Sequence, residues 1–155
     1  MALQDCHNIL VPIDGSDNAL RAVDYAAALA SSAGMQILLL HVGPLSPIRM
    51  LEAMGYPAAT RDKAREATAE FETDRAEMAE ALFKAARERI PDGVEVGQIL
   101  EAGDPAQVII DEVDKLGNAV IVMGNRGLSS VREVMLGSVS NKVLHRARCP
   151  VTIVR

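Results

Sequence analysis

The sequence predicts an α/β fold in which a five-stranded parallel sheet is covered by helices on both faces. Short apolar runs alternate along the chain with longer segments of helical periodicity, which is the order typical of βαβ units. The longest of these runs are apolar without alternation, as in strands that are buried on both faces. No linker or second core interrupts the alternation. We therefore expect one domain over residues 1–155, with the strand order 3-2-1-4-5.

The first half of the chain carries two strands and two helices. A buried strand at 8–13 ends beside Asp14, and Ser16 caps a helix that ends at Gly34. A second strand follows at 35–42, and 43–59 is a proline-bearing loop, long enough to be functional or mobile. A long helix spans 60–90. Its predicted apolar stripe consists of Ala64, Ala67, Phe71, Met78, Leu82 and Ala85.

The second half of the chain repeats the alternation. A strand at 94–102 is more polar than the others, so we expect it near an edge of the sheet. Asp104 caps a third helix, with Pro105 at its first position and Gly117 after its end. Strands follow at 118–123 and 150–155. Between them lie a glycine-containing loop and a helix from Ser138 to about Arg146.

Composition limits the classes of function and partner. The formal net charge of −5 argues against binding to nucleic acid or to an anionic membrane surface, since both require a basic surface. Cys6 and Cys149 are too few and too far apart for a metal motif, and we expect two reduced thiols. The first residues do not resemble a leader, and no apolar run reaches the roughly 18 residues of a membrane span. We therefore expect a cytoplasmic protein.

The most informative stretch joins the fourth strand to the last helix. In open α/β sheets, ligands bind beyond the carboxyl ends of the strands, at the point where the strand order reverses. In the expected order the first strand ends at Asp14 and its neighbour ends at Gly124, so both residues border this crevice. Further glycines at positions 127 and 137 allow the backbone to approach a ligand closely.

The chemistry of this crevice suits an anion. The amides of Ser138, Val139 and Ser140 open a helix, where the macrodipole favours negative charge. The two serine hydroxyls and the charge of Arg126 would add to the effect, whereas Asp14 suits a ribose hydroxyl or a metal ion carried by a nucleotide. The familiar phosphate-binding motifs are absent from the sequence. The residues alone leave two interpretations open, a phosphate site or a flexible connection followed by an ordinary helix cap.

The spacing Gly124-x2-Gly127-x9-Gly137-Ser138 resembles the ATP-binding pattern of the universal stress protein family. Four further stretches resemble landmarks of that family in their expected order: NILVPIDGSDNALRAVDYAAALA, LLLHV, GDPAQVIIDEV and GSVSNKVLHRARCPVTIVR. The resemblance covers nearly the whole chain. It implies a Rossmann-like fold of the adenine nucleotide alpha hydrolase type. It also implies that the chain is one of the members that keep the glycine pattern and bind ATP.

The resemblance further implies a role for each matching position. On the adenine and nucleoside side it implies Pro12, Ile13, Val42 and Met123. On the ribose and α-phosphate side it implies Asp14, Gly124, Arg126 and Gly127. On the β- and γ-phosphate side it implies Gly137, Ser138, Val139 and Ser140. The implied ligand is ATP with Mg²⁺ or Mn²⁺ on its phosphates, with no metal held directly by the protein.

No catalytic constellation is evident in the sequence. Hydrolysis of ATP would need a base and charge stabilisation at the γ-phosphate, for which His41, Asp14 and Arg126 are the nearest candidates. His41 is more simply interpreted as a histidine packed or hydrogen-bonded near the end of its strand. We therefore interpret the chain as a nucleotide-dependent regulatory module of the stress response, with at most slow ATP hydrolysis. Two alternatives are the same fold working only through protein contacts, and an ATP-hydrolysing enzyme.

The last strand is expected at the edge of the sheet. It carries no charge until Arg155, and an exposed apolar edge invites pairing with another chain. A two-fold homodimer would bury Val151–Arg155 by antiparallel pairing, and the family resemblance implies the same arrangement. Met50 and Met54, in the loop at 43–59, would form an apolar lid or partner surface, or simply a loosely packed loop. The sequence does not identify a downstream protein partner.

Overall fold

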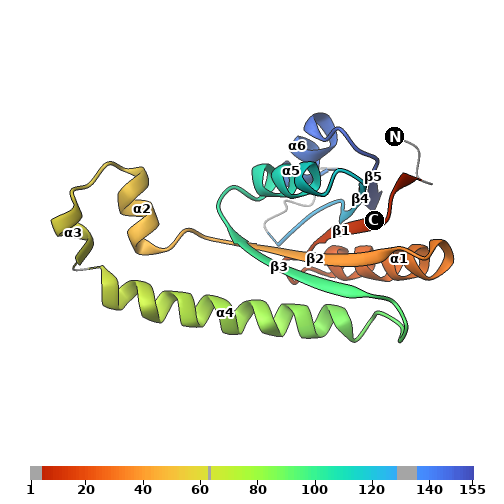
Figure 1. The fold of residues 1–155 in the computed structure, drawn as a ribbon, viewed down its shortest axis with the longest axis horizontal. Helices are drawn as coiled ribbons and strands as arrows, with labels where there is room; N and C mark the ends of the chain where they lie inside the picture. Colours follow the sequence, from red (N-terminus) through yellow and green to blue (C-terminus); the bar gives the residue numbers. More distant parts are fainter. Residues whose placement is uncertain (1–4, 63, 129–135) are drawn as a thin grey trace.

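A parallel sheet forms the centre of the computed structural model, which describes residues 5–62, 64–128 and 136–155. Its five strands lie in the order β3-β2-β1-β4-β5 (Figure 1). The strands are β1 (Asn8–Pro12), β2 (Gln36–Gly43), β3 (Val96–Ala102), β4 (Ala119–Gly124) and β5 (Val151–Val154). The predicted fold class and strand order are confirmed.

The order of the strands reverses at β1. Ile9 of β1 is in register with Ile37 of β2 on one side and with Val120 of β4 on the other. After β1 the chain winds outward through β2 and β3, and after β4 it winds the other way to β5. The connections that leave β1 and β4 therefore diverge at the carboxyl end of the sheet, which opens a crevice between them.

Helices cover both faces of the sheet (Figure 1). On one face, α1 (Asp17–Ala33) and α4 (Arg65–Arg87) bury a cluster that includes Val11, Leu39 and Val122. On the other face, α5 (Pro105–Leu116) and α6 (Ser138–Arg146) bury a cluster that includes Leu10 and Ile121. Each fully buried aliphatic side chain contributes about 1.5–3 kcal/mol by leaving water. Because strand side chains alternate between these two clusters, the register of the whole sheet is fixed.

The predicted caps are present where the sequence placed them. The Ser16 hydroxyl accepts a hydrogen bond from the Ala19 amide at 3.2 Å, and Gly34 ends α1 at φ 66°. The Asp104 carboxylate accepts from the Gln107 amide at 3.0 Å, with Pro105 at the first position of α5. These local signals fix the directions in which α1 and α5 leave the sheet.

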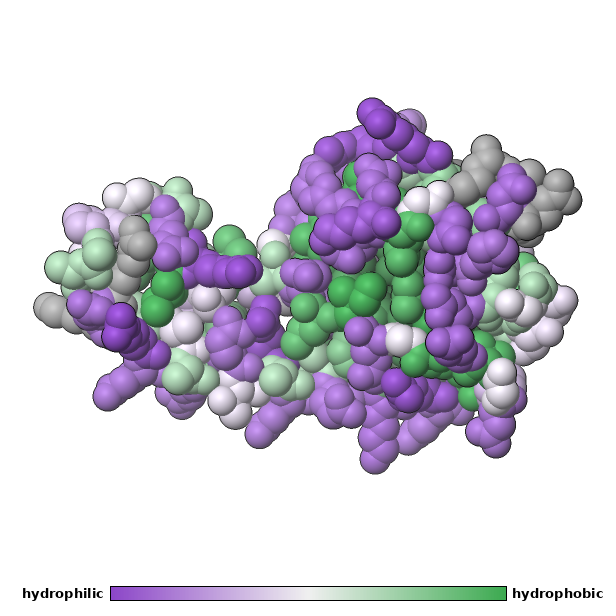
Figure 2. Space-filling view, viewed as in Figure 1, coloured by the Kyte–Doolittle hydropathy of each residue, from purple (hydrophilic) through white to green (hydrophobic). Residues whose placement is uncertain are grey.

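The segment predicted as a loop at 43–59 contains helix, so that prediction is wrong. It holds α2 (Pro47–Ala53) and the first two residues of α3 (Ala58–Asp62). Both helices project beyond the sheet together with the start of α4 (Figure 1). The signal was present, since Ser46 and Pro47 form a typical helix start. We call residues 44–62 the arm. Figure 2 shows it as a separate lobe, set off from the rest of this face by a recess.

The predicted apolar stripe of the long helix is only partly correct, because Leu82 packs against the core but other members of the stripe are exposed. Met78 is 65% exposed, whereas α4 buries Ala79, Phe83 and Ala86 against the sheet. Alanines occur on several sides of this helix, so they do not select a face. The aromatic ring of Phe83 buries more area than any alanine, and it determines which side meets the core. No helix among the described residues is long and apolar enough to cross a bilayer.

Candidate functional site

A cavity of about 570 Å³ opens at the carboxyl end of the sheet, where the strand order reverses. Its size is typical of sites for small-molecule ligands. Residues of β1, β2 and β4 and the first turns of α5 and α6 line it. The lining includes all the residues that the sequence analysis singled out: Pro12, Ile13, Asp14, Val42, Met123, Gly124, Arg126, Gly127, Gly137, Ser138, Val139 and Ser140.

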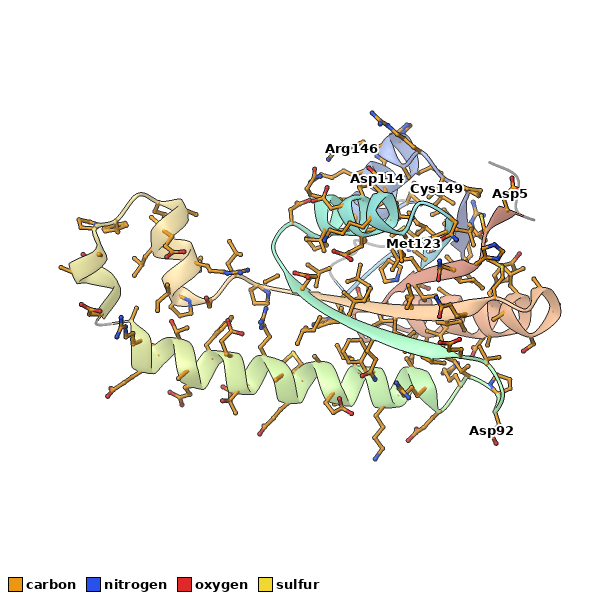
Figure 3. All side chains as sticks on the ribbon, in the orientation of Figure 1. Asp5, Asp92, Asp114, Met123, Arg146 and Cys149 are labelled. Atoms are coloured by element: carbon orange, nitrogen blue, oxygen red, sulfur yellow. The ribbon has the colours of Figure 1, made fainter. Side chains whose placement is uncertain are left out.

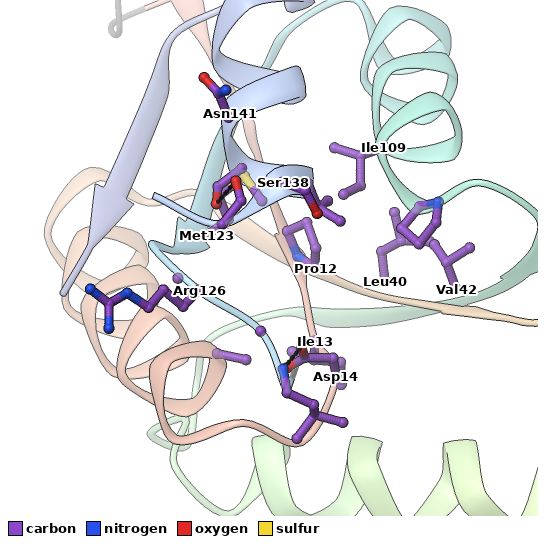
Figure 4. A pocket seen from close by; sticks show the side chains of 18 of the residues that line it. Pro12, Ile13, Asp14, Leu40, Val42, Ile109, Met123, Arg126, Ser138 and Asn141 are labelled. Carbon is purple, nitrogen blue, oxygen red and sulfur yellow. Dashed lines mark hydrogen bonds between the residues drawn. The ribbon is translucent and has the colours of Figure 1, made fainter. Parts of the chain in front are cut away.

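One wall of the cavity is apolar. It is formed by four side chains of one apolar cluster, those of Leu40 and Val42 of β2, Ile109 of α5 and Met123 of β4 (Figure 4). Leu40 and Ile109 are each 1% exposed and belong to the core. A wall of rigid aliphatic side chains suits a flat ring system, which is held by apolar contact. Side chains two positions apart on a strand face the same side, so the prediction of Val42 could have been extended to Leu40. Pro105 and Ile109 belong to α5, and the sequence does not specify where α5 packs on the sheet.

The opposite side of the cavity is polar and is built by the start of α6. Gly137 is the N-cap residue at φ −70° and ψ 160°, and it supplies no side-chain cap. The amides of Ser138, Val139 and Ser140 form the first turn, so they have no intrahelical acceptor. They line the cavity at the positive end of the helix dipole, which favours a negatively charged group.

Both carboxylate oxygens of Asp14 are engaged within the protein. Oδ1 accepts hydrogen bonds from the Ser16 amide at 3.0 Å and from the Ser16 hydroxyl at 2.6 Å. Oδ2 accepts from the Leu128 amide at 3.2 Å, across a sequence separation of 114 residues. Asp14 thus lies at the edge of the cavity, as predicted, but it also connects the end of β1 to the loop after β4.

Contacts within the chain account for the three glycines of the motif. A side chain at Gly124 would come within 2.8 Å of the backbone of Asn18, at the start of α1. A side chain at Gly127 would overlap the Asp14 carboxylate. At Gly137 the Cβ would lie 3.3 Å from the Arg126 Cα. Close approach of the chain to itself therefore requires a small residue at these positions, whether or not a ligand also approaches them.

The side chain of Arg126 does not carry its charge into the cavity. Its guanidinium extends away from Asp14 and Ser138 (Figure 4), and its Nε is buried without a hydrogen bond to any described residue. Arg126 still contributes to the lining of the cavity, and a positive charge directed at a ligand from this loop stays a prediction.

The hydroxyl of Ser140 is also committed within the protein. Ser140 is 2% exposed, and its hydroxyl donates to the Asn125 carbonyl at 2.9 Å. The Gly137 amide donates to the same carbonyl at 2.7 Å. The start of α6 is thus held to the loop after β4. Of the two serine hydroxyls expected to face a ligand, that of Ser138 lies on the exposed rim of the cavity.

His41 lies on the other face of the sheet. Its neighbours Leu40 and Val42 face the cavity, so strand alternation directs His41 toward α4. Its Nδ1 is 2.9 Å from the Ile13 carbonyl oxygen, which can only accept, so Nδ1 carries a proton. The geometry therefore supports the interpretation of His41 as a histidine that is hydrogen-bonded near the end of its strand.

Several described residues on the lining were missed by the sequence analysis: Ala19, Leu40, Pro105, Ile109, Leu128, Leu136 and Asn141. Asp14 is the one carboxylate in the described lining. Within 5–62, 64–128 and 136–155, no cluster of histidine, cysteine or carboxylate side chains could hold a metal ion. Most of the spacer between Gly127 and Gly137 lies outside the described residues.

Comparison with known proteins gives a consistent match in sequence. A model of the universal stress protein family matches residues 6–155. The chain is 34% identical to the universal stress protein YxiE of Bacillus subtilis over 149 residues, which cover 96% of this chain and 99% of that protein. It is 37% identical over 147 residues to a universal stress protein of Thermus aquaticus, covering 95% of this chain and 97% of that protein.

Solved structures match in fold. The structure of the protein MJ0577 of Methanocaldococcus jannaschii superposes with a TM-score of 0.73 at 25% identity, covering 97% of this chain and 96% of that one. A universal stress protein in complex with cAMP gives 0.64 at 20% identity, with 97% and 98% covered. A family member from Archaeoglobus fulgidus in complex with dAMP gives 0.60 at 22% identity, with 97% and 99% covered.

Proposed function

This chain belongs to the universal stress protein family, and from that premise we propose that it is a regulatory module that binds ATP. The observation that carries the proposal is the cavity at the switch point of the sheet. There an apolar wall and the open amides of a helix start line one space. A nucleotide combines the two matching chemistries, a flat base and a chain of phosphates.

The two sides of the cavity suggest how the nucleotide would lie. The base would occupy the apolar wall, beside Pro12, Val42 and Met123. The ribose would lie near Asp14, and the phosphates would extend toward the amides of Ser138–Ser140. Family members solved with cAMP and with dAMP support an adenine nucleotide as the ligand class.

The residues present fit a divalent cation that arrives with the nucleotide. Mg²⁺ is commonly held by substrate phosphates and keeps several waters, so it would be carried by the phosphates, while the Asp14 carboxylate at the edge of the cavity remains for the ribose. The cation would neutralise phosphate charge at the mouth of the cavity. Mn²⁺ prefers the same oxygen ligands.

We expect hydrolysis of the bound nucleotide to be slow at most. The described lining contains no histidine or lysine, and His41 is bonded to the Ile13 carbonyl on the other face. The Asp14 carboxylate already accepts three hydrogen bonds from Ser16 and Leu128. A general base and a fixed charge at the γ-phosphate would have to come from elsewhere. Rapid phosphate release that is lost on Asp14→Ala would favour an enzyme instead.

A second candidate function is action through protein contacts without nucleotide. Two observations favour it: the motif glycines are explained by contacts within the chain, and Met50 and Met54 of the arm are 53% and 68% exposed. For either function we propose a cytoplasmic protein that forms homodimers through Val151–Arg155, the free edge of the sheet.

Titration calorimetry with ATP and Mg²⁺ separates the two functions, with AMP, cAMP and GTP as comparison ligands. Binding should also raise the stability of the protein, by about 2.7 kcal/mol at a ligand concentration of one hundred times Kd. For a chain of this size, this stabilisation raises the melting temperature by several degrees. No heat and no thermal shift with millimolar ATP would reject the nucleotide proposal and leave the protein-contact function.

A further inference from the structure

The loop after β4 is fixed at its base by hydrogen bonds and close packing within the chain. We call residues 124–128 the glycine loop. Gly124 packs against the Asn18 backbone, and the Asn125 amide donates to the Val154 carbonyl at 2.8 Å. The Asn125 carbonyl in turn accepts from the Gly137 amide and the Ser140 hydroxyl. The first half of the glycine loop is therefore held to α1, β5 and α6.

The far end of the glycine loop depends on Asp14. Leu128 is 76% exposed, so its side chain gains little from packing. Its amide donates to Asp14 Oδ2, and Ser16 holds the other carboxylate oxygen in place. Gly127 lies so close to that carboxylate that a side chain would overlap it. One carboxylate at the end of β1 thus holds the loop against the rim of the cavity.

We propose that Asp14 is a positioning residue that clasps the glycine loop, and that the affinity for nucleotide depends on this clasp. The coupling to nucleotide rests on the proposed function, whereas the clasp itself does not. A carboxylate offers about four acceptor sites, and the chain fills three of them. The remaining site on Oδ2 accepts one ligand hydroxyl without releasing the Leu128 amide. A bound ribose therefore adds to the clasp and does not compete with it.

Hydrogen exchange at the Leu128 amide tests the clasp in nucleotide-free protein. Asp14→Ala should speed exchange at Leu128 about tenfold, because a hydrogen bond to a charged acceptor is lost. Exchange in β3, which contributes no residue to the described lining of the cavity, should be unchanged and serves as the internal control. Equal exchange at Leu128 in the variant and the parent protein would overturn the clasp, whatever the protein binds.

A double-mutant cycle tests the coupling to nucleotide. Gly127→Ala pushes the carboxylate and the loop apart and should weaken ATP binding about tenfold, and Asp14→Ala should weaken it by at least as much. If Asp14 acts through the loop, the double variant should bind ATP with an affinity within about twofold of that of Asp14→Ala alone. Without the carboxylate, a methyl group at position 127 no longer overlaps anything at position 14. If the double variant instead loses ATP affinity by the product of the two single losses, Asp14 acts on the ligand independently of the loop, and the coupling is overturned.

Gly137→Ala provides the matched control in the same motif. Its added methyl group would lie 3.3 Å from the Arg126 Cα and 3.4 Å from the Asn125 carbonyl oxygen, away from Asp14. The fold-loss of ATP affinity that it causes should therefore multiply with the loss caused by Asp14→Ala when the two substitutions are combined. A control pair that is also non-additive would show a general collapse of the loop and overturn the specific role of Asp14. If no variant or parent binds ATP, the proposed function fails while the exchange measurement still decides the clasp.

Discussion

Gly124 ends β4 directly beside the first turn of α1. The position of an added Cβ lies 2.8 Å from the carbonyl carbon, the carbonyl oxygen and the Cβ of Asn18. Because two of these atoms are backbone, the helix start must shift to admit a methyl group. We expect Gly124→Ala to lower the free energy of unfolding by about 1–3 kcal/mol, the usual cost of overpacking.

Urea denaturation measures this cost, and Gly137→Ala gives the comparison. The nearest atoms to a Cβ at Gly137 lie at 3.3–3.4 Å, so that substitution should be milder. Equal stability of Gly124→Ala and the parent protein would show that α1 can move away from β4 at no cost.

Cys6 and Cys149 are not joined by a disulfide bond, and they belong to the two different apolar clusters of the sheet. Burial raises the pKa of both thiols, which keeps them protonated at neutral pH. Figure 3 shows Cys149 at the same end of the molecule as Asp5, beside α6. The expectation of two reduced thiols agrees with the absence of a disulfide between these two residues.

The raised pKa predicts slow alkylation of the native protein, since the thiolate is the nucleophile. Iodoacetamide at pH 7.5 should modify both cysteines more slowly in the folded protein than in urea, as followed by intact mass. The native rates should continue to rise at pH values where the unfolded thiols have already levelled off. Native and unfolded rates that coincide would contradict the burial of these residues.

At the scale of elements, α5 begins with a charged cap. The Gln107 amide, and to a lesser extent the Lys142 side chain, hold the pKa of Asp104 below its usual value of 3.8. Because the folded pKa lies below the unfolded one, this stabilisation is present above the unfolded value. It is lost as the pH falls through the folded pKa.

We expect Asp104→Ala to destabilise the protein by about 1 kcal/mol at neutral pH through loss of the cap. The difference from the parent protein should shrink as the pH falls below 3.8 and then through the lower folded pKa, below which the carboxylate is protonated in both states. Denaturation at several pH values measures it. Asp104→Asn keeps a capping oxygen and should retain most of the stability at neutral pH. A loss for Asp104→Asn as large as that for Asp104→Ala would assign the effect to the ion pair with Lys142.

A proline at position 138 would remove a single backbone amide, that of Ser138, from the start of α6. Proline is well tolerated at the first position of a helix, and the preceding Gly137 has the extended ψ of 160° that a residue before proline prefers. Ser138→Pro should therefore keep the helix and remove one donor from the cavity. We expect about tenfold weaker binding of ATP, with adenosine binding unchanged, because only the phosphates meet this amide.

Ser138→Ala is the control for this prediction, because it removes the hydroxyl and keeps the amide. Calorimetry of both variants with ATP, AMP and adenosine distinguishes the two groups. If Ser138→Pro binds ATP as tightly as Ser138→Ala does, the phosphates do not lie at the start of α6.

The elements that the sequence predicted well are those set by local chemistry. Ser16, Gly34, Asp104 and Gly117 fix the ends of α1 and α5 through hydrogen bonds within a few residues. The face that α4 buries depends on the sheet beneath it, and alanines on several sides conceal it from the pattern. The local start signal of α2 at Ser46 and Pro47 was present in the sequence but was outweighed by the surrounding prolines.

In the candidate site, too, the features set by local sequence were predictable and the features set by packing between distant segments were not. The positions that line the cavity follow from the ends of predicted strands and helices, which the sequence locates. The direction of the Arg126 side chain and the partners of Asp14 depend on how the glycine loop packs against β1. The Leu128 amide and Asp14 are separated by 114 residues, and no local pattern contains that contact.

At the scale of the whole molecule, β5 leaves one side of its backbone open. The Ile121 and Asn125 amides donate to the carbonyls of Pro150 and Val154, so these alternate residues of β5 face β4. Val151 and Ile153 therefore direct their own backbone amides and carbonyls to the free edge. Antiparallel pairing with β5 of a second copy would satisfy these groups and form a two-fold interface.

Ile153→Pro tests this dimer by removing the backbone amide of Ile153, which faces the free edge of β5. Proline removes the outward amide and leaves the pairing of β5 with β4 intact, since the Ile153 amide does not face β4. Ile153→Val shortens the side chain by a similar amount and keeps the amide, so it controls for lost packing in the core. We expect the parent protein and Ile153→Val to sediment as dimers at micromolar concentration, and Ile153→Pro to sediment as a monomer with a similar melting curve. A parent protein that stays monomeric at all concentrations, or a proline variant that still dimerises, would show that the free edge of β5 is not the interface.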